Sequence, residues 1–177
     1  MNSANQRGLD IVAAIGLGAG AVFGMAGTFV EQASLRQVFW AIDGVGLVVA
    51  TSLLTVRFFR SGNDCVAAGF LVFAIGESLL VSGTAGGLEA SVPSFGGGVA
   101  LWAAALLLTS IPKEFATWVR LVGVFASVLF IIVAARIFWG ERLLPTSSPL
   151  PFFAYPFLVM TLVGWIWALV KSEASQR

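Results

Sequence analysis

The feature that most constrains this chain is a series of apolar stretches, each long enough to cross a bilayer as a helix, joined by short polar segments. A helix rises about 1.5 Å per residue, so about 20 apolar residues cover the roughly 30 Å of hydrocarbon. The stretches cover residues 9–30, 38–59, 67–85, 95–111, 115–139 and 152–170. The sequence therefore predicts an all-α integral membrane protein: one domain over residues 1–177, folded as a compact bundle of six transmembrane helices.

The composition agrees with lipid as the solvent and narrows the chemistry. The chain is 58% hydrophobic and 11% charged, whereas soluble domains are about 25% charged. It has no histidine, which excludes His-based haem or metal sites and Ser-His-Asp triads, and its one cysteine, Cys65, cannot form an internal disulfide. The net charge of +1 gives no argument for nucleic acid. We expect no cofactor and no metal, and a non-enzymatic role is favoured.

Two of the six stretches leave alternatives open. The stretch before Ile111 reaches spanning length only if it starts near Phe95 and includes the glycines at 96–98. The first stretch follows Arg7 and loosely resembles a secretory signal, but its apolar run is longer than a typical signal core. We therefore interpret the first stretch as a retained helix.

Four glycines of the first stretch fall on one face of a helix: Gly16, Gly20, Gly24 and Gly27. Such a stripe of small residues lets another helix backbone approach closely, and close packing drives helix association in lipid. Packing inside the monomer is the simpler interpretation. The alternative is an interface with a membrane-protein partner or a second copy of the chain.

The distribution of basic residues predicts the orientation. With six crossings, seven lysines and arginines lie on the side of the termini and three on the other side. Positive charge is retained on the cytoplasmic side, so both termini are expected to be cytoplasmic. The membrane is expected to be a bacterial inner membrane or a plasma membrane, whose lipids are the expected partners.

Three ionisable residues on three different stretches are predicted to share the outer half of the bundle. From the helix rise, Asp43 lies roughly 8 Å, Glu77 roughly 12 Å and Arg136 roughly 5 Å below the outer boundary. An ionisable group within a membrane is costly and marks a functional site by default. The functional interpretation is an outward-facing pocket in which Arg136 pairs with one carboxylate and the other takes up a proton or contacts a cationic ligand.

The residues around Glu77 extend this hypothesis. Ser78 and Ser82 lie one turn apart on the same stretch and are candidates for lining a polar path, as is Thr84. The structural alternative is that an Arg–carboxylate pair only sets helix register, with Arg136 reaching the interface. Outside the stretches, the proline-rich segment 146–156 is either a lid over the pocket or an interfacial aromatic belt.

Three functions remain open from these features. The first is a small carrier or ligand-binding membrane module that uses the outer-half site. The second is an interaction or scaffold subunit of a larger membrane complex, associated through the glycine stripe. The third is a membrane enzyme that acts on a lipid or quinone through carboxylate acid–base chemistry, which requires an enclosed cavity with two carboxyl groups.

The predicted topology can be tested with fusion reporters. A reporter fused after Gln176 is expected in the cytoplasm, and one inserted at Glu89 on the opposite side, because three crossings separate Glu89 from the carboxyl terminus. Alkaline phosphatase and green fluorescent protein fusions report the two compartments. Both reporters on the same side would contradict six crossings.

Overall fold

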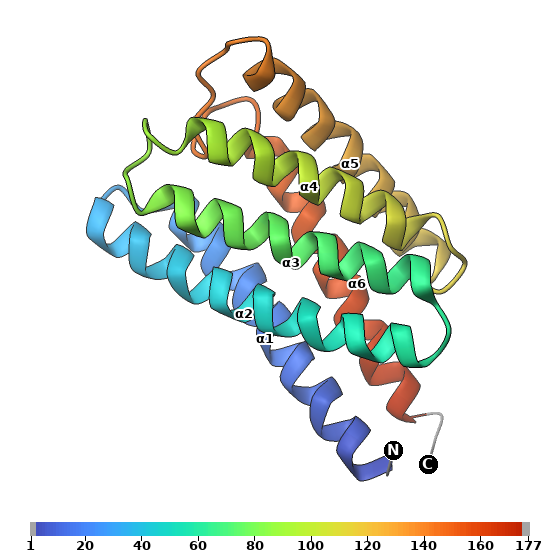
Figure 1. Cartoon of the computed structure of the whole chain (residues 1–177). Helices are drawn as coiled ribbons and strands as arrows, with labels where there is room; N and C mark the ends of the chain where they lie inside the picture. The colour runs from blue at the N-terminus through green and yellow to red at the C-terminus, as the bar shows by residue number, and fades with distance from the viewer. Residues whose placement is uncertain (1–2, 175–177) are drawn as a thin grey trace.

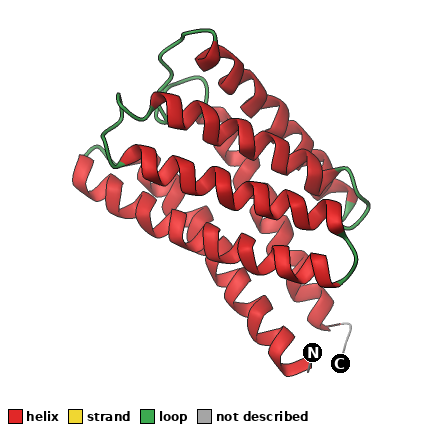
Figure 2. Ribbon diagram, viewed as in Figure 1, coloured by secondary structure: helices red, strands yellow, loops and turns green. Residues whose placement is uncertain are grey.

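Six long helices run back and forth through the molecule, with short connections between them except for the longer one, residues 139–151, between α5 and the turn before α6 (Figures 1 and 2). This computed structural model describes residues 3–174, and the side chains of residues 6–171. The all-helical class and the number of long helices are confirmed, and the described part contains no strand. The helices are α1 (Ser3–Phe29), α2 (Ala33–Arg60), α3 (Asp64–Thr84), α4 (Val92–Ser110), α5 (Thr117–Phe138) and α6 (Tyr155–Ala174), with a short 3-10 turn at Phe152–Ala154 before α6.

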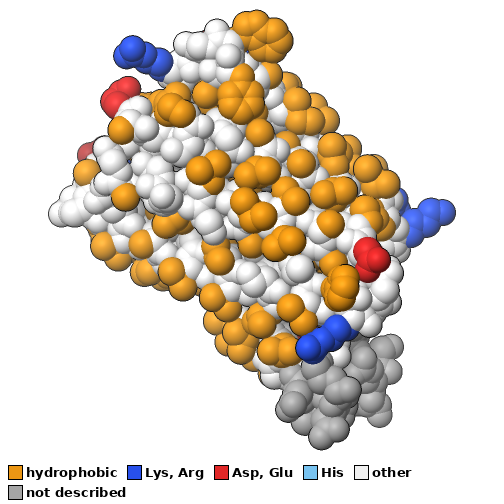
Figure 3. Space-filling model, in the orientation of Figure 1, with side chains coloured by type: hydrophobic (Ala, Val, Ile, Leu, Met, Phe, Trp, Pro, Cys, Tyr) orange, Lys and Arg blue, Asp and Glu red, His pale blue; other side chains and the backbone are white. Residues whose placement is uncertain are grey.

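All six helices are long and apolar enough to cross a membrane. Large apolar side chains such as Ile15, Leu121 and Val163 point outward and are at least half exposed. Figure 3 shows hydrophobic side chains over the middle of one face of the bundle, with charged side chains near its edges. In water this surface would be unfavourable, so the chain is an integral membrane protein whose sides face lipid.

Several helix boundaries differ from the sequence-based expectation, and two of the differences shorten a connection. Helix α2 begins at Ala33, so the connection from α1 is only residues 30–32 rather than 31–37. Helix α4 begins at Val92 and takes the glycines at 96–98 into its interior, with Pro93 in the first turn, where proline is tolerated.

The helices form a closed ring in sequence order. Each helix packs against the next one along the chain, and α6 also packs against α1. In Figure 1, α6 crosses behind α3 and α4, and α1 begins at the same end of the bundle at which α6 finishes. Both ends of the described chain are therefore on one side of the membrane, here called the terminal end. Arg177, which the charge count includes, lies outside the described residues.

The glycine stripe of α1 packs against α2 inside the chain. A Cβ atom on Gly16 would lie 2.5 Å from the backbone oxygen of Gly46, and one on Gly20 would overlap the side chain of Leu47. The other two glycines of the stripe contact α2 in the same way. Because α2 covers the stripe, it is not a free surface for a partner helix.

A second glycine contact joins α3 and α4. A Cβ atom on Gly76 would lie 3.0 Å from the backbone oxygen of Gly98, and the reverse distance is also 3.0 Å. The glycines that weakened the prediction of the fourth span therefore serve as its packing surface. Small residues at such crossings let two backbones approach closely in lipid.

An ion pair links α1 and α2 near the terminal end. Arg57 on α2 contacts the carboxylate of Asp10 on α1, and Asp10 is buried. Asp10 falls within the first predicted span, residues 9–30, and was not predicted to form an ion pair. The pair explains how an acidic residue is accommodated there, because a buried charge needs a partner of opposite sign.

Two glycines two residues apart on α1 test the packing argument. The Gly16→Ala variant is expected to lower the free energy of unfolding by about 1–3 kcal/mol, because the new methyl group meets the α2 backbone. The Gly18→Ala variant is the control, since nothing lies within 4 Å of its Cβ position. Unfolding by sodium dodecyl sulfate, followed by circular dichroism, measures both. Equal stability of the two variants would contradict the close contact.

Candidate functional site

A cavity lies in the half of the bundle away from the terminal end, which we call the distal half. Its walls come from α1, α2, α3, α4 and α6, and Pro145 of the α5–α6 connection also lines it. Its volume is about 80 Å³, which is room for a few waters. Its lining includes both carboxylates predicted for a membrane-embedded site, Asp43 and Glu77.

Asp43 reaches the cavity because α1 has glycines opposite it. A Cβ atom on Gly24 would lie 2.9 Å from the Oδ2 atom of Asp43, and one on Gly20 would lie 3.2 Å from its Oδ1 atom. The side chain is 9% exposed, and Oδ1 is buried without a hydrogen-bond partner. The glycine stripe therefore makes room for a carboxylate as well as for the α2 backbone.

Glu77 approaches the cavity from α3 and is the more deeply buried carboxylate. It is 2% exposed, and its Oε2 atom has no hydrogen-bond partner. Its other oxygen, Oε1, lies against α2, where a Cβ atom on Gly44 would be 3.3 Å away. The indole of Trp102 on α4 is near enough to interact with this carboxylate, but its Nε1 atom forms no hydrogen bond of good geometry.

The acidic groups of the cavity act on one another. Asp43 and Glu77 are close enough for their charges to interact, and Tyr155 on α6 is close enough for its hydroxyl to interact electrostatically with both carboxyl groups. The Tyr155 hydroxyl donates a hydrogen bond to the carbonyl oxygen of Pro145 at 2.8 Å. Among the described side chains, the cavity lining contains no lysine or arginine. The site therefore has two carboxyl groups from two helices and no protein cation to balance them.

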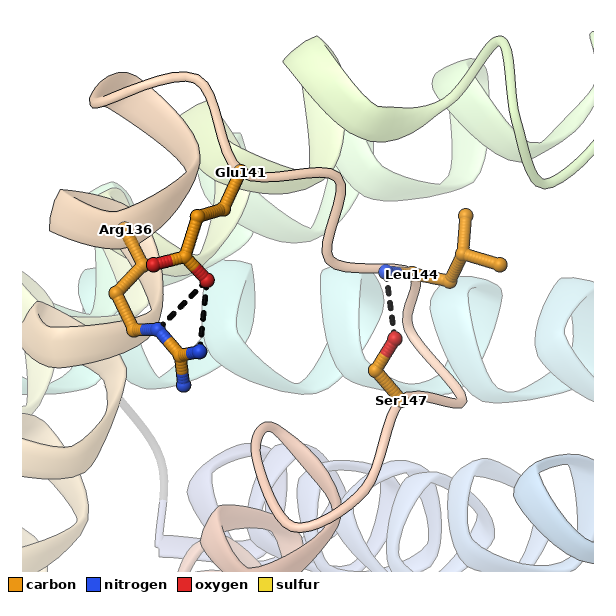
Figure 4. Close-up of polar contacts among 4 residues, drawn as sticks. All are labelled: Arg136, Glu141, Leu144 and Ser147. Atoms are coloured by element: carbon orange, nitrogen blue, oxygen red, sulfur yellow. Dashed lines mark hydrogen bonds and ion pairs between the residues drawn. The ribbon is translucent and has the colours of Figure 1, made fainter.

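The expected pairing of Arg136 with one of these carboxylates is wrong. Arg136 lies at the end of α5, is exposed, and donates from Nε to Oε2 of Glu141 at 2.9 Å (Figure 4). A second guanidinium nitrogen lies 2.7 Å from the same oxygen. The physical reason is the tight turn at Gly140, whose φ of +97° folds Glu141 back toward α5. Helix α5 contributes nothing to the cavity lining.

Ser78 and Ser82 also lie outside the cavity, contrary to the prediction. Both are exposed on the outer surface of α3, and the Ser78 hydroxyl donates to the carbonyl oxygen of Ala74 at 2.8 Å. The residues of α3 that face the cavity are Glu77, Leu80, Val81 and Thr84. Their spacing of three, four and seven residues marks one helix face, and the serines lie off it.

Two polar aromatic residues of the lining were not predicted from the sequence. Trp102 was counted as part of an apolar span, and Tyr155 was assigned to the segment before the sixth span. A signal was available for Tyr155, because it is the only tyrosine in the chain and stands next to the start of a span. In the structure it is the first residue of α6, and with Pro145 it places the α5–α6 connection at the cavity.

A cluster of aromatic rings closes the bundle beyond the cavity. Phe70 lies at the centre, with ring centroids 4.8 Å from Trp165 and 5.4 Å from Phe58. Phe73 links this cluster to Trp102, whose ring stacks on it at 5.5 Å. All of these rings are buried. The cavity is consequently separated from the terminal end by close-packed side chains. Its opposite end, here called its mouth, is lined by residues near the distal ends of the helices, such as Thr28 and Thr84, and by Pro145.

This geometry suits binding of a small molecule with a positive or hydrogen-bonding group. Buried polar atoms are normally hydrogen-bonded, so two carboxyl groups that line a cavity, each with one buried oxygen that has no partner, mark a place for water or a ligand. Ligand sites are typically apolar cavities with a few convergent polar groups. Here Asp43 and Glu77 supply the polar groups, and aliphatic and aromatic side chains supply the remaining wall.

Two adjacent leucines of α3 test whether the cavity is open to water. Leu80 lines the cavity, whereas Leu79 points outward and is 39% exposed. In a Cys65→Ser background, Leu80→Cys is expected to react at least tenfold faster than Leu79→Cys with a charged methanethiosulfonate applied at the distal face. The reason is that the thiolate is the reactive form of cysteine, and a thiol ionises in a water-filled cavity but not in lipid. Labelling after unfolding confirms that both cysteines are present, and equal rates in the folded protein would contradict an open cavity.

No protein-family model, curated protein or solved structure matches this chain.

Proposed function

We propose that this protein is a small carrier or ligand-binding membrane module that takes up a small solute in the distal cavity. The observation that carries this proposal is the pair of carboxyl groups, Asp43 and Glu77, that line one cavity, with one oxygen of each buried and without a hydrogen-bond partner. Leaving such groups unsatisfied costs free energy, on the order of 1–3 kcal/mol for each group. A ligand that satisfies both would recover this cost on binding.

The charge distribution supports uptake from the outside. The terminal end carries Arg57, Arg60, Lys113 and Lys171, which are among the seven basic residues counted on that side. By the positive-inside rule this end is cytoplasmic, so the mouth of the cavity faces the exterior or the periplasm. Residence in a bacterial inner membrane or a plasma membrane belongs to the same proposal.

The aromatic cluster is where a carrier and a ligand-binding module would behave differently. A carrier must open a route past Phe70 and Trp165 to the terminal end, whereas a ligand-binding module keeps this cluster closed. The two are distinguished in sealed vesicles loaded with a solute that binds. A carrier releases the solute at a rate that depends on the protein, and a binding module does not.

The geometry argues against an interaction subunit that uses the glycine stripe, and it leaves some support for a membrane enzyme. An interaction subunit that uses the glycine stripe loses its surface, because α2 covers Gly16 and Gly20. A membrane enzyme acting on a lipid or quinone retains one supporting observation, since two carboxyl groups share one cavity. An enzyme would convert its substrate, whereas a carrier or binding module returns it unchanged, and mass spectrometry of the recovered solute separates the two cases.

Ligand binding is tested by thermal stabilisation of the purified protein in detergent. We expect at least one class in a panel of cationic, neutral and anionic solutes of up to about eight non-hydrogen atoms to raise Tm, because ligands of the folded state stabilise it. The Thr84→Trp variant, which fills the mouth of the cavity, should lose this increase. Ser82→Trp, on the lipid-facing side of α3, should retain it. No stabilisation by any solute class would contradict the proposal.

A further inference from the structure

We propose that the ligand of the distal cavity is a small organic cation of the alkylammonium type, held between the carboxyl groups of Asp43 and Glu77 and the aromatic rings of the wall. This inference rests on the proposed ligand-binding function and adds the chemical class of the ligand. It depends on three features of the cavity: its charge, its aromatic lining and its size.

The charge of the cavity favours a cation over a neutral or anionic ligand. The acidic side chains of the lining come from α2 and α3. The lining side chains of α1 and α4, such as Thr28 and Trp102, carry no charge. Arg136, the cation expected there, is engaged with Glu141 outside the cavity. Burial and mutual repulsion disfavour the ionised forms of these two carboxyl groups, so a cation between them offsets that cost, whereas an anion would add to it.

The remaining polar capacity of the lining argues against a hard metal ion. Asp43 and Glu77 are the two carboxyl groups of the lining, and the described residues contain no cluster of three or more His, Cys, Asp or Glu side chains that could hold a metal. By comparison, Ca²⁺ takes six to eight oxygen ligands, mostly from carboxylates and carbonyls. Aromatic side chains occupy the wall instead, namely Trp40, Phe95, Trp102 and Tyr155.

Aromatic rings beside carboxylates are the pattern that recognises ammonium groups. The face of an aromatic ring is negative and attracts a cation, and a methylated ammonium also buries apolar surface against the ring. In this cavity the rings come from α2, α4 and α6, and both carboxylates lie among them. A ligand at this place would therefore contact acidic and aromatic groups at once.

The size of the cavity sets an upper limit on the ligand. A volume of about 80 Å³ has room for a few waters, and a cavity of about 150 Å³ is known to hold benzene. Tetramethylammonium and choline are therefore the largest ligands considered. Larger cations with extended apolar tails exceed this space unless the tail leaves through the mouth.

The test compares choline with its neutral isostere, 3,3-dimethylbutan-1-ol, by isothermal titration calorimetry on the purified full-length protein. We expect choline or tetramethylammonium to bind at least tenfold more tightly than the isostere, because the two compounds differ in charge while nearly matching in shape. Glu77→Gln and Asp43→Asn should each weaken cation binding at least tenfold. Glu141→Gln, which removes an exposed carboxylate paired with Arg136, is the control and should bind like the wild type.

The outcomes separate this inference from the proposed function. Equal affinity for the cation and the isostere, or stabilisation by neutral or anionic solutes and not by ammonium compounds, overturns the cation assignment and leaves ligand binding in place. Absence of binding by every solute class overturns both. The charge comparison uses the wild-type protein alone, so it remains decisive even where a variant does not fold.

Discussion

Close contact between α1 and α2 at the glycine stripe is the constraint on which the rest of this structure depends. At Gly16 the two backbones approach so closely that a single methyl group would not fit. One to two turns further along, the same stripe faces Asp43, and there the missing side chains become space for a carboxylate. The stripe thus sets the distance between two helices and also permits a polar group on the inner face of α2.

The two halves of the bundle accommodate buried acidic side chains in different ways. Near the terminal end, Asp10 pairs with Arg57, and each charge has a partner of opposite sign. In the distal half, Asp43 and Glu77 face a cavity with no basic residue among its described lining side chains. A paired charge can serve structure alone, whereas two carboxyl groups that line a cavity without a counter-charge are candidates for a ligand site. This contrast within one chain directs attention to the distal half.

Some of the site was predictable from the sequence because depth in a membrane follows from counting residues. The helix rise places Asp43 and Glu77 in the same half of the bundle, and the structure brings both to one cavity. Depth gives no information on rotation about a helix axis, which is why Ser78 and Ser82 were expected in a cavity that they do not line. The same limit applies to Arg136, whose partner is set by the turn at Gly140 rather than by its depth.

The sequence by itself determined that the chain crosses a membrane as six helices, because hydrocarbon requires long apolar segments that satisfy their own backbone hydrogen bonds. Only the tertiary structure decided which side chains meet, because helices that are apolar on every face carry little signal of which face turns inward. The ring order of the helices, the burial of the glycine stripe by α2 and the joining of Tyr155 and Trp102 to the two carboxylates all depend on that rotation.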